Sequence, residues 1–240
     1  SSHGDWPCHV SLNKSGRKAV VSNYGGGSIA LYNISRDGKL NEASQIFDYN
    51  TEDRKSHAHS AQFFQNELFV SDLGQNAVYQ YTLKNELYQI ASPSIFKTTG
   101  NPGPRHFVIT RNGGFIYVIN EYASSITALK KTEDGYEIID EDSTLDEQFQ
   151  GNNSCADIHL SRNEQFLYGS NRGENTIAVF KRDRYNGTIE KIQTISVNGD
   201  WPRNFTLDPS GKFLLVANKK SNNISVFKVG LKTGMLTYLN

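Results

Sequence analysis

The sequence of 240 residues has little of several features that mark particular protein classes. It has two cysteines, Cys8 and Cys155, and no CxxC pair, so neither a disulfide framework nor a cysteine-based zinc site is expected. It has no apolar run close to the roughly 18 residues that span a bilayer. Lys and Arg number 25 and Asp and Glu number 25, and this net charge of zero argues against a nucleic-acid or membrane-surface partner.

What the sequence has in abundance is internal repetition. The tetrapeptide Gly4-Asp5-Trp6-Pro7 recurs as Gly199-Asp200-Trp201-Pro202. Between these two places, apolar runs end in an Asn or Asp that recurs every 47 to 51 positions. We call these the anchor residues: Asn23, Asp72, Asn120, Asn171 and Asn218. A fixed period of this length indicates stacked structural units.

Each repeat contains four short runs rich in Val, Ile, Tyr and Phe, separated by turn residues such as Arg111-Asn112-Gly113-Gly114. No 11-residue window keeps a helical period. Four antiparallel strands per repeat are typical of a β-propeller blade. We therefore predict an all-β chain, residues 1–240, that forms a single propeller domain of four-stranded blades. The five predicted repeats cover about 7–50, 56–100, 103–147, 154–199 and 201–240.

Polar residues of different kinds occupy equivalent positions near the start of the first strand and just after the anchor residue. The first and second strands form a hairpin, so both positions lie at the same end of a blade. If the first strand is innermost, they ring one mouth of the channel. Such chemical variety on a regular scaffold favours a site over polar side chains that only satisfy one another. The candidates are His9, His59, Arg105, His106, Glu121, Asp157, Arg172 and Arg203, with His57 close by.

Several of these segments resemble the lactonase family of seven-bladed propellers, and the resemblance covers essentially the whole chain. The matching motifs include Ser56-His57-Ala58-His59-Ser60, Gly103-Pro104-Arg105-His106, Asn120-Glu121, Ser170-Asn171-Arg172-Gly173 and Trp201-Pro202-Arg203. The resemblance implies a ring of seven blades, so we expect this chain to be a fragment of a longer protein. It also implies that one His of His-x-His, His59 rather than His57, acts together with Arg105, Glu121 and Arg172.

The resemblance implies hydrolysis of a sugar lactone, of the 6-phosphogluconolactonase kind that belongs to the pentose phosphate pathway. A carboxy-muconate lactonizing cycloisomerase and a non-catalytic binding propeller are the alternatives. We predict His59, Arg105, Glu121 and Arg172 as catalytic residues, with either His59 or Glu121 as the general base. Arginines suit an oxyanion or a substrate anion. The predicted substrate-binding residues are His9, His57, His106, Asp157 and Arg203.

The remaining expectations concern metals, cysteines and location. His57-x-His59 has a spacing used by metal sites, but no third ligand is fixed by local spacing, so neither a metal nor a cofactor is expected. We expect Cys8 and Cys155 to be small buried thiols rather than nucleophiles. The expected partner is a small anionic lactone, a monomer is compatible with this, and the location is cytoplasmic. Since the chain is expected to be a fragment, its lack of a signal peptide carries little weight.

Overall fold

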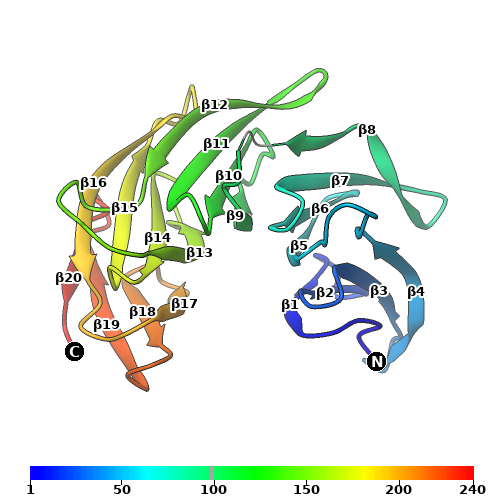
Figure 1. Cartoon of the computed structure of the whole chain (residues 1–240), viewed down its shortest axis with the longest axis horizontal. Coiled ribbons are helices and arrows are strands. Elements are labelled where there is room, and N and C mark those ends of the chain that lie inside the picture. The colour runs from blue at the N-terminus through cyan, green and yellow to red at the C-terminus, as the bar shows by residue number, and fades with distance from the viewer. Residues whose placement is uncertain (98–99) are drawn as a thin grey trace. The chain divides into compact units, whose positions relative to one another are not determined.

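The structure is a computed structural model that describes residues 1–97 and 100–240, with the backbone alone described for residues 92–97. Residues 98–99, at the end of the second predicted repeat, lie outside the described part. The chain divides into two compact units, residues 1–105 with 133–135 and residues 106–132 with 136–240, and each is described by itself. The described residues form strands and turns but no helix, and hence none that could cross a membrane (Figure 1).

Two four-stranded antiparallel sheets lie in the first unit, and in both the spatial order of the strands is their sequence order. The first sheet comprises β1 (Pro7–Leu12), β2 (Lys18–Asn23), β3 (Ser28–Ile34) and β4 (Leu40–Asp48). The second comprises β5 (Ala58–Phe64), β6 (Glu67–Asp72), β7 (Ala77–Lys84) and β8 (Leu87–Lys97). Leu31, Leu68, Val70 and Tyr81 are buried in the apolar core of this unit.

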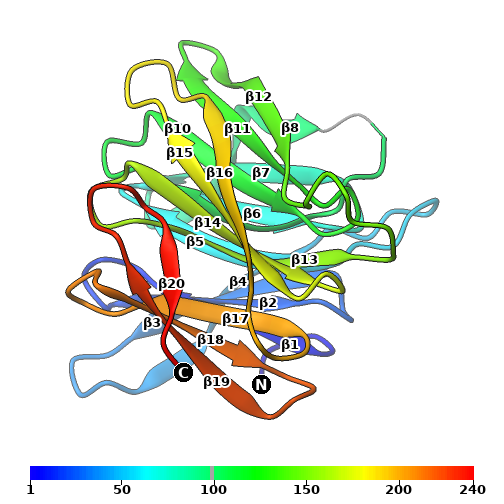
Figure 2. The same ribbon diagram turned by 90° about the vertical axis from the view of Figure 1, so that its left-hand side faces the viewer.

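Three further sheets follow with the same topology (Figures 1 and 2). The third comprises β9 (Pro104–Ile109), β10 (Phe115–Asn120), β11 (Ser125–Thr132) and β12 (Gly135–Ser143). The fourth comprises β13 (Ser154–Leu160), β14 (Phe166–Arg172), β15 (Thr176–Arg182) and β16 (Ile189–Ser196). The fifth comprises β17 (Pro202–Leu207), β18 (Phe213–Asn218), β19 (Asn223–Val229) and β20 (Leu236–Tyr238).

Each sheet is built from one sequence repeat, which confirms the all-β class and the β-propeller architecture. Strands form here because β-branched and aromatic residues pack well on a half-buried pleated surface. The hairpin turns match the turn residues of the sequence. For example, Gly113, Glu164 and Gly211 occupy the same place in three sheets with positive φ of 70°, 56° and 72°. That all five sheets belong to one domain, and that the chain is a fragment, stay predictions.

The anchor residues are buried at the ends of the second strands, where their side chains make hydrogen bonds. The amide of Asn120 donates to the hydroxyls of Ser125 (2.9 Å) and Thr127 (2.8 Å) on the next strand. The carboxylate of Asp72 accepts from the backbone N–H groups of His57 (2.9 Å) and Gln75 (3.0 Å). A short polar side chain in this place satisfies the groups around it as the chain reverses. The recurrence of Asn or Asp at this position of each repeat therefore has a local structural cause.

Aromatic side chains fill the space between adjacent sheets of the second unit. Tyr117 is fully buried, its hydroxyl donates to the carbonyl of Gly187 (2.8 Å), and it accepts from Nε of Arg182 (2.6 Å). The Arg182 guanidinium lies over the rings of Phe115 (4.9 Å) and Tyr117 (5.6 Å). Burial raises the pKa of Tyr117 to about 12, although Arg182 opposes the shift. The Tyr117 hydroxyl therefore stays protonated at neutral pH and accepts a hydrogen bond from the buried Arg182 guanidinium.

We expect Tyr117→Phe to lower the free energy of unfolding by about 2 kcal/mol, because the change leaves a buried guanidinium N–H without an acceptor. Tyr168→Phe is the matched control. Tyr168 is also fully buried and donates to the carbonyl of Gly234 (3.0 Å), but no guanidinium donates to its hydroxyl. We expect its loss to be about 1 kcal/mol. Urea unfolding measures both, and equal losses would contradict this account of Arg182.

Candidate active site

A recurrent irregularity marks the start of the first strands. In four sheets the register between the first and second strands shifts between Pro7 and His9, Ala58 and Ser60, Cys155 and Ile158, and Pro202 and Asn204. The residues at these shifts are Cys8, His59, Ala156 with Asp157, and Arg203. Bulges re-aim side chains and are common beside active sites. Candidate residues thus lie where the strands are locally irregular.

In the first unit, two histidines gather around Tyr24. The His57 ring stacks on the Tyr24 ring at 4.4 Å, and its Nδ1–H donates to the Tyr24 carbonyl (3.0 Å). The His59 ring meets the same tyrosine edge-on at 5.5 Å and is buried. The Cys8 thiol lies 3.9 Å from Nδ1 of His59. The rings of His57 and His59, which are separated by one residue in the sequence, therefore both contact Tyr24.

The other two candidates of the first unit are placed by backbone contacts. Nδ1 of His9 accepts from the backbone N–H of Ala61 (3.4 Å). Arg105 is buried, and its carbonyl accepts from the hydroxyl of Ser71 (2.6 Å), which fixes the backbone at the start of β9. These contacts restrict the position of the His9 ring and of the Arg105 backbone.

In the second unit, Glu121 and Arg172 form an ion pair of 2.8 Å between Oε2 and Nη2. Each residue directly follows an anchor residue, so the anchors fix the backbone from which the pair extends. The Arg172 guanidinium is buried and also donates to the carbonyls of Ser154 (3.2 Å) and Cys155 (2.5 Å). These contacts use Nε and Nη2, and within the described residues Nη1 makes no hydrogen bond. The Nη1 nitrogen of this fixed cation can therefore still donate a hydrogen bond.

Trp201 lies beside this pair. The Arg172 guanidinium carbon is 5.5 Å from the Trp201 ring centroid, and Nζ of Lys220 is 3.5 Å from it. An aromatic face between two cations is a favourable arrangement. Arg203, two residues further along the chain, is exposed and makes no hydrogen bond or ion pair with any described residue. The structure therefore brings Glu121 to Arg172 but leaves Arg203 separate.

Asp157 is the centre of a second cluster in the same unit. Its buried carboxylate accepts from Nδ1–H of His106 (2.8 Å) and Nε2–H of His159 (3.2 Å). It also accepts from the side chain of Asn204 (2.6 Å) and the backbone N–H of Phe205 (3.2 Å). Burial alone would raise the pKa of Asp157, but the hydrogen bonds and charges of His106 and His159 hold it far below its usual range. An ionised Asp157 thus orients His106.

Sequence reasoning missed three contributors, His159, Tyr24 and Trp201, as parts of a site. His159 lies two positions after Asp157, so strand alternation could have indicated it. Tyr24 directly follows an anchor residue, as Glu121 and Arg172 do, and that shared position was a signal. Trp201 directly precedes β17, and its contact with the Arg172 guanidinium depends on side-chain positions that the sequence does not give.

The expectation for the two cysteines was half wrong. Cys155 is buried, and burial raises the pKa of its thiol to about 12, so it stays protonated at neutral pH. Cys8 is exposed rather than buried, because it lies in β1, a strand in which no residue is buried. Its thiol nevertheless reaches the carbonyl of His59 (3.3 Å).

A comparison of the whole chain with models of protein families identifies its family. A family model described as lactonase, seven-bladed β-propeller, matches residues 1–240. The chain belongs to this family. The resemblance read from the motifs is thereby confirmed.

Named relatives agree with the family. The chain is 33% identical to a 6-phosphogluconolactonase of Formosa agariphila, over 97% of this chain and 69% of the relative. It is 30% identical to a 6-phosphogluconolactonase of Bacillus subtilis, over 98% of this chain and 70% of the relative. The structure of a periplasmic gluconolactonase of Pseudomonas aeruginosa matches with a TM-score of 0.91 and 28% identity, over 100% of this chain and 71% of that one. Together these similarities support a lactone-hydrolysing enzyme.

We expect Asp157→Asn to lower the free energy of unfolding at pH 7 by about 2–3 kcal/mol, because an amide cannot accept all the hydrogen bonds that the carboxylate receives. The folded pKa of Asp157 is depressed, so its contribution is complete above about pH 4 and is lost as the pH falls. The difference between wild type and variant should therefore shrink by about 1 kcal/mol per pH unit below pH 4. Urea titrations at pH 7 and pH 3 measure it.

Glu147→Gln is the control, since Glu147 is exposed and makes no hydrogen bond or ion pair among the described residues. It should match wild type at both pH values. A difference for Asp157→Asn that stays the same at pH 3 would show that the ionised carboxylate is not the stabilising form.

Proposed function

We propose that this protein hydrolyses the ring ester of a phosphorylated sugar lactone, with 6-phosphogluconolactone as its substrate. Water adds to the lactone carbonyl carbon, the bond from that carbon to the ring oxygen breaks, and the ring oxygen takes a proton to give the open-chain acid. The family and the names of the relatives support this reaction over the cycloisomerase alternative. Cytoplasmic location and a place in the pentose phosphate pathway belong to the same proposal.

The observation that carries the proposal is the Glu121–Arg172 pair. A tetrahedral intermediate places negative charge on the former carbonyl oxygen, and a preorganised donor aimed at that oxygen lowers the barrier. Arg172 keeps its charge at any working pH and is fixed by Glu121 and two backbone carbonyls. Its Nη1 group, which makes no hydrogen bond within the described residues, is the proposed oxyanion donor.

Glu121 and His59 are the two candidates for the general base. The Glu121 side chain is 17% exposed, so a water molecule can approach it, whereas the whole His59 residue is 4% exposed. We assign the base to Glu121 on this difference in access. His59 and Arg105 keep the catalytic roles that the motifs imply, and how they contribute stays part of the proposal.

The proposed substrate-binding residues divide by chemistry. Arg203 is an exposed cation without a partner among the described residues, which suits the phosphate group. His106 is oriented by Asp157, and an imidazole held in one orientation suits a polar substrate such as a sugar. His9 and His57 are proposed for the same task in the first unit.

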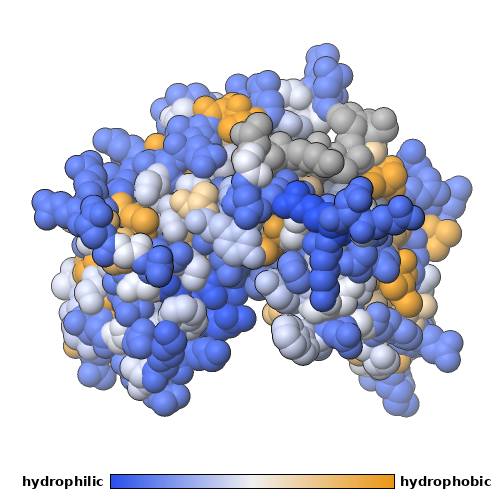
Figure 3. Space-filling model, in the orientation of Figure 1, coloured by the Kyte–Doolittle hydropathy of each residue, from blue (hydrophilic) through white to orange (hydrophobic). Residues whose placement is uncertain are grey.

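The face of the molecule in Figure 3 favours a small ligand over a broad apolar partner. The face in Figure 3 is mostly hydrophilic, and its hydrophobic residues occur in small separate groups. A docking platform for another protein would be expected to carry a larger continuous apolar patch. We therefore do not favour the non-catalytic binding propeller.

The decisive assay follows hydrolysis of 6-phosphogluconolactone by the full-length protein, corrected for the spontaneous reaction. We expect Glu121→Gln and Arg172→Met each to lower kcat by roughly 10²–10³-fold, because each removes a group used in the transition state. Lys212→Gln, an exposed change in the turn before β18, should leave kcat unchanged. If both site variants keep wild-type rates, this assignment is wrong, and if His59→Gln alone abolishes activity, the base is His59.

Arg203→Gln should separate binding from chemistry. We expect it to raise KM for 6-phosphogluconolactone by about tenfold, the value of one charge-assisted hydrogen bond, with little change in kcat. KM for unphosphorylated gluconolactone should stay the same, since that substrate lacks the phosphate. An equal effect on both lactones would remove Arg203 from the phosphate site.

A further inference from the structure

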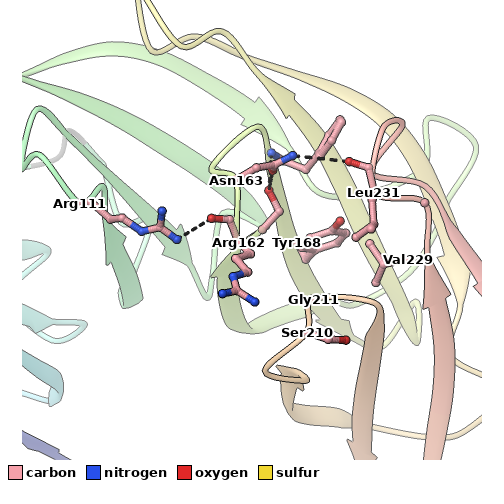
Figure 4. Close-up of a pocket in the computed structure, with 11 residues that line it drawn as sticks. Arg111, Arg162, Asn163, Tyr168, Ser210, Gly211, Val229 and Leu231 are labelled. Carbon is pink, nitrogen blue, oxygen red and sulfur yellow. Dashed lines mark hydrogen bonds between the residues drawn. The ribbon is translucent and has the colours of Figure 1, made fainter.

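A cavity of about 370 Å³ lies between the fourth and fifth sheets, within the second unit (Figure 4). Its apolar side is formed by Phe166 and Tyr168 of β14 and by Val229 and Leu231 at the end of β19. Ser161, which directly follows the end of β13, also lines it, whereas Asp157 lies in the middle of that strand. This size is within the range of small-molecule sites.

The repeat explains why the cavity exists. Arg182 and Val229 occupy equivalent positions, since their backbone N–H groups donate to the carbonyls of Gln165 and Lys212, just before β14 and β18. Between the third and fourth sheets, the long Arg182 side chain covers the aromatic pair of β10, as described above. Between the fourth and fifth sheets the equivalent pair is Phe166 and Tyr168, which is likewise buried, and the shorter Val229 leaves a cavity beside it. The cavity therefore occurs where the side chain from the next sheet is short instead of long.

The charges around the cavity differ from those around Arg182. Arg111 and Arg162 line its edge, and none of the described lining residues is acidic. The Arg162 guanidinium donates to the Pro209 carbonyl (3.0 Å), and its other N–H groups make no hydrogen bond with described residues. Two carboxylates of the neighbouring turns already have partners, Glu164 with Arg111 and Asp208 with Ser210 (2.6 Å). The cavity therefore combines an apolar side with a cationic edge.

We propose that this cavity is a second ligand site, distinct from the lactone site, that binds a small aromatic carboxylate. The ring lies against the apolar side of the cavity, beside Phe166, Val229 and Leu231. The carboxylate accepts hydrogen bonds from Arg162, whose planar fork matches a carboxylate. Aromatic pairs and charge-assisted hydrogen bonds are both favourable in a partly enclosed site.

Benzoate and benzamidine are the probes, because they have nearly the same shape and opposite charge. Titration of the full chain, followed by ligand-observed NMR, should give a dissociation constant on the order of 1 mM for benzoate. Benzamidine should bind at least tenfold more weakly. Absence of saturable benzoate binding, or tighter binding of benzamidine, would overturn the proposal, and the second result would mean that the cavity accepts a cation as its counterpart does.

Two variants locate the binding. Val229→Met extends an unbranched side chain into the cavity, and Arg162→Gln removes the cationic donor. Each should weaken benzoate binding by at least tenfold while lactone hydrolysis stays at the wild-type rate. A thermal melt reports whether Val229→Met is folded, and the exposed Arg162→Gln decides the question by itself if it is not.

Arg203→Gln is the matched control, since it removes an arginine from the proposed lactone site in the same unit. It should leave benzoate binding unchanged. If Arg203→Gln abolishes benzoate binding while Arg162→Gln does not, benzoate binds at the lactone site and the second site is rejected. Because these readouts do not depend on turnover, a failed lactonase assay leaves the test intact.

Discussion

The structure depends on a buried polar side chain at the end of each second strand. Such a residue would be costly to bury alone, and it persists because it bonds the next strand or the neighbouring loop. Asn120 does this through two hydroxyls of β11, and Asp72 through two backbone N–H groups. Once this position is fixed, the residue that follows it extends from a defined point on the backbone. Glu121 and Arg172 gain their geometry in this way.

Regular architecture and irregular chemistry are separated by position within each repeat. The middle of the sheets carries interchangeable apolar residues such as Ile119 and Ile177, which need only fill space. The start of the first strand is locally irregular and carries unlike residues, among them His59 and Asp157. A scaffold of repeats can therefore place several different functional groups without changing its core.

The fold was predictable from sequence, whereas the contacts within the site were not. Strands, turns and the repeat follow from local signals, and residues such as Gly113 and Asn120 mark them directly. The Glu121–Arg172 pair and the contact of His106 with Asp157 depend on side-chain orientation and on distances between sheets. The exposure of Cys8 was missed for a related reason, since the exposure of the whole strand β1 depends on what packs against it and cannot be read from alternation alone. The end of the blade at which the candidate residues lie was predictable from the repeat, whereas their hydrogen-bond and ion-pair partners were not.

The Asp157 carboxylate joins three repeats through hydrogen bonds. It holds His106 of the third sheet and Asn204 of the fifth, and itself belongs to the fourth. Repeats that arise by duplication are usually free to drift apart one at a time. Here a substitution in one of the three leaves an unmet donor or acceptor in the others. We therefore expect substitutions at His106, Asp157 and Asn204 to be correlated during evolution, and not to occur independently in each repeat.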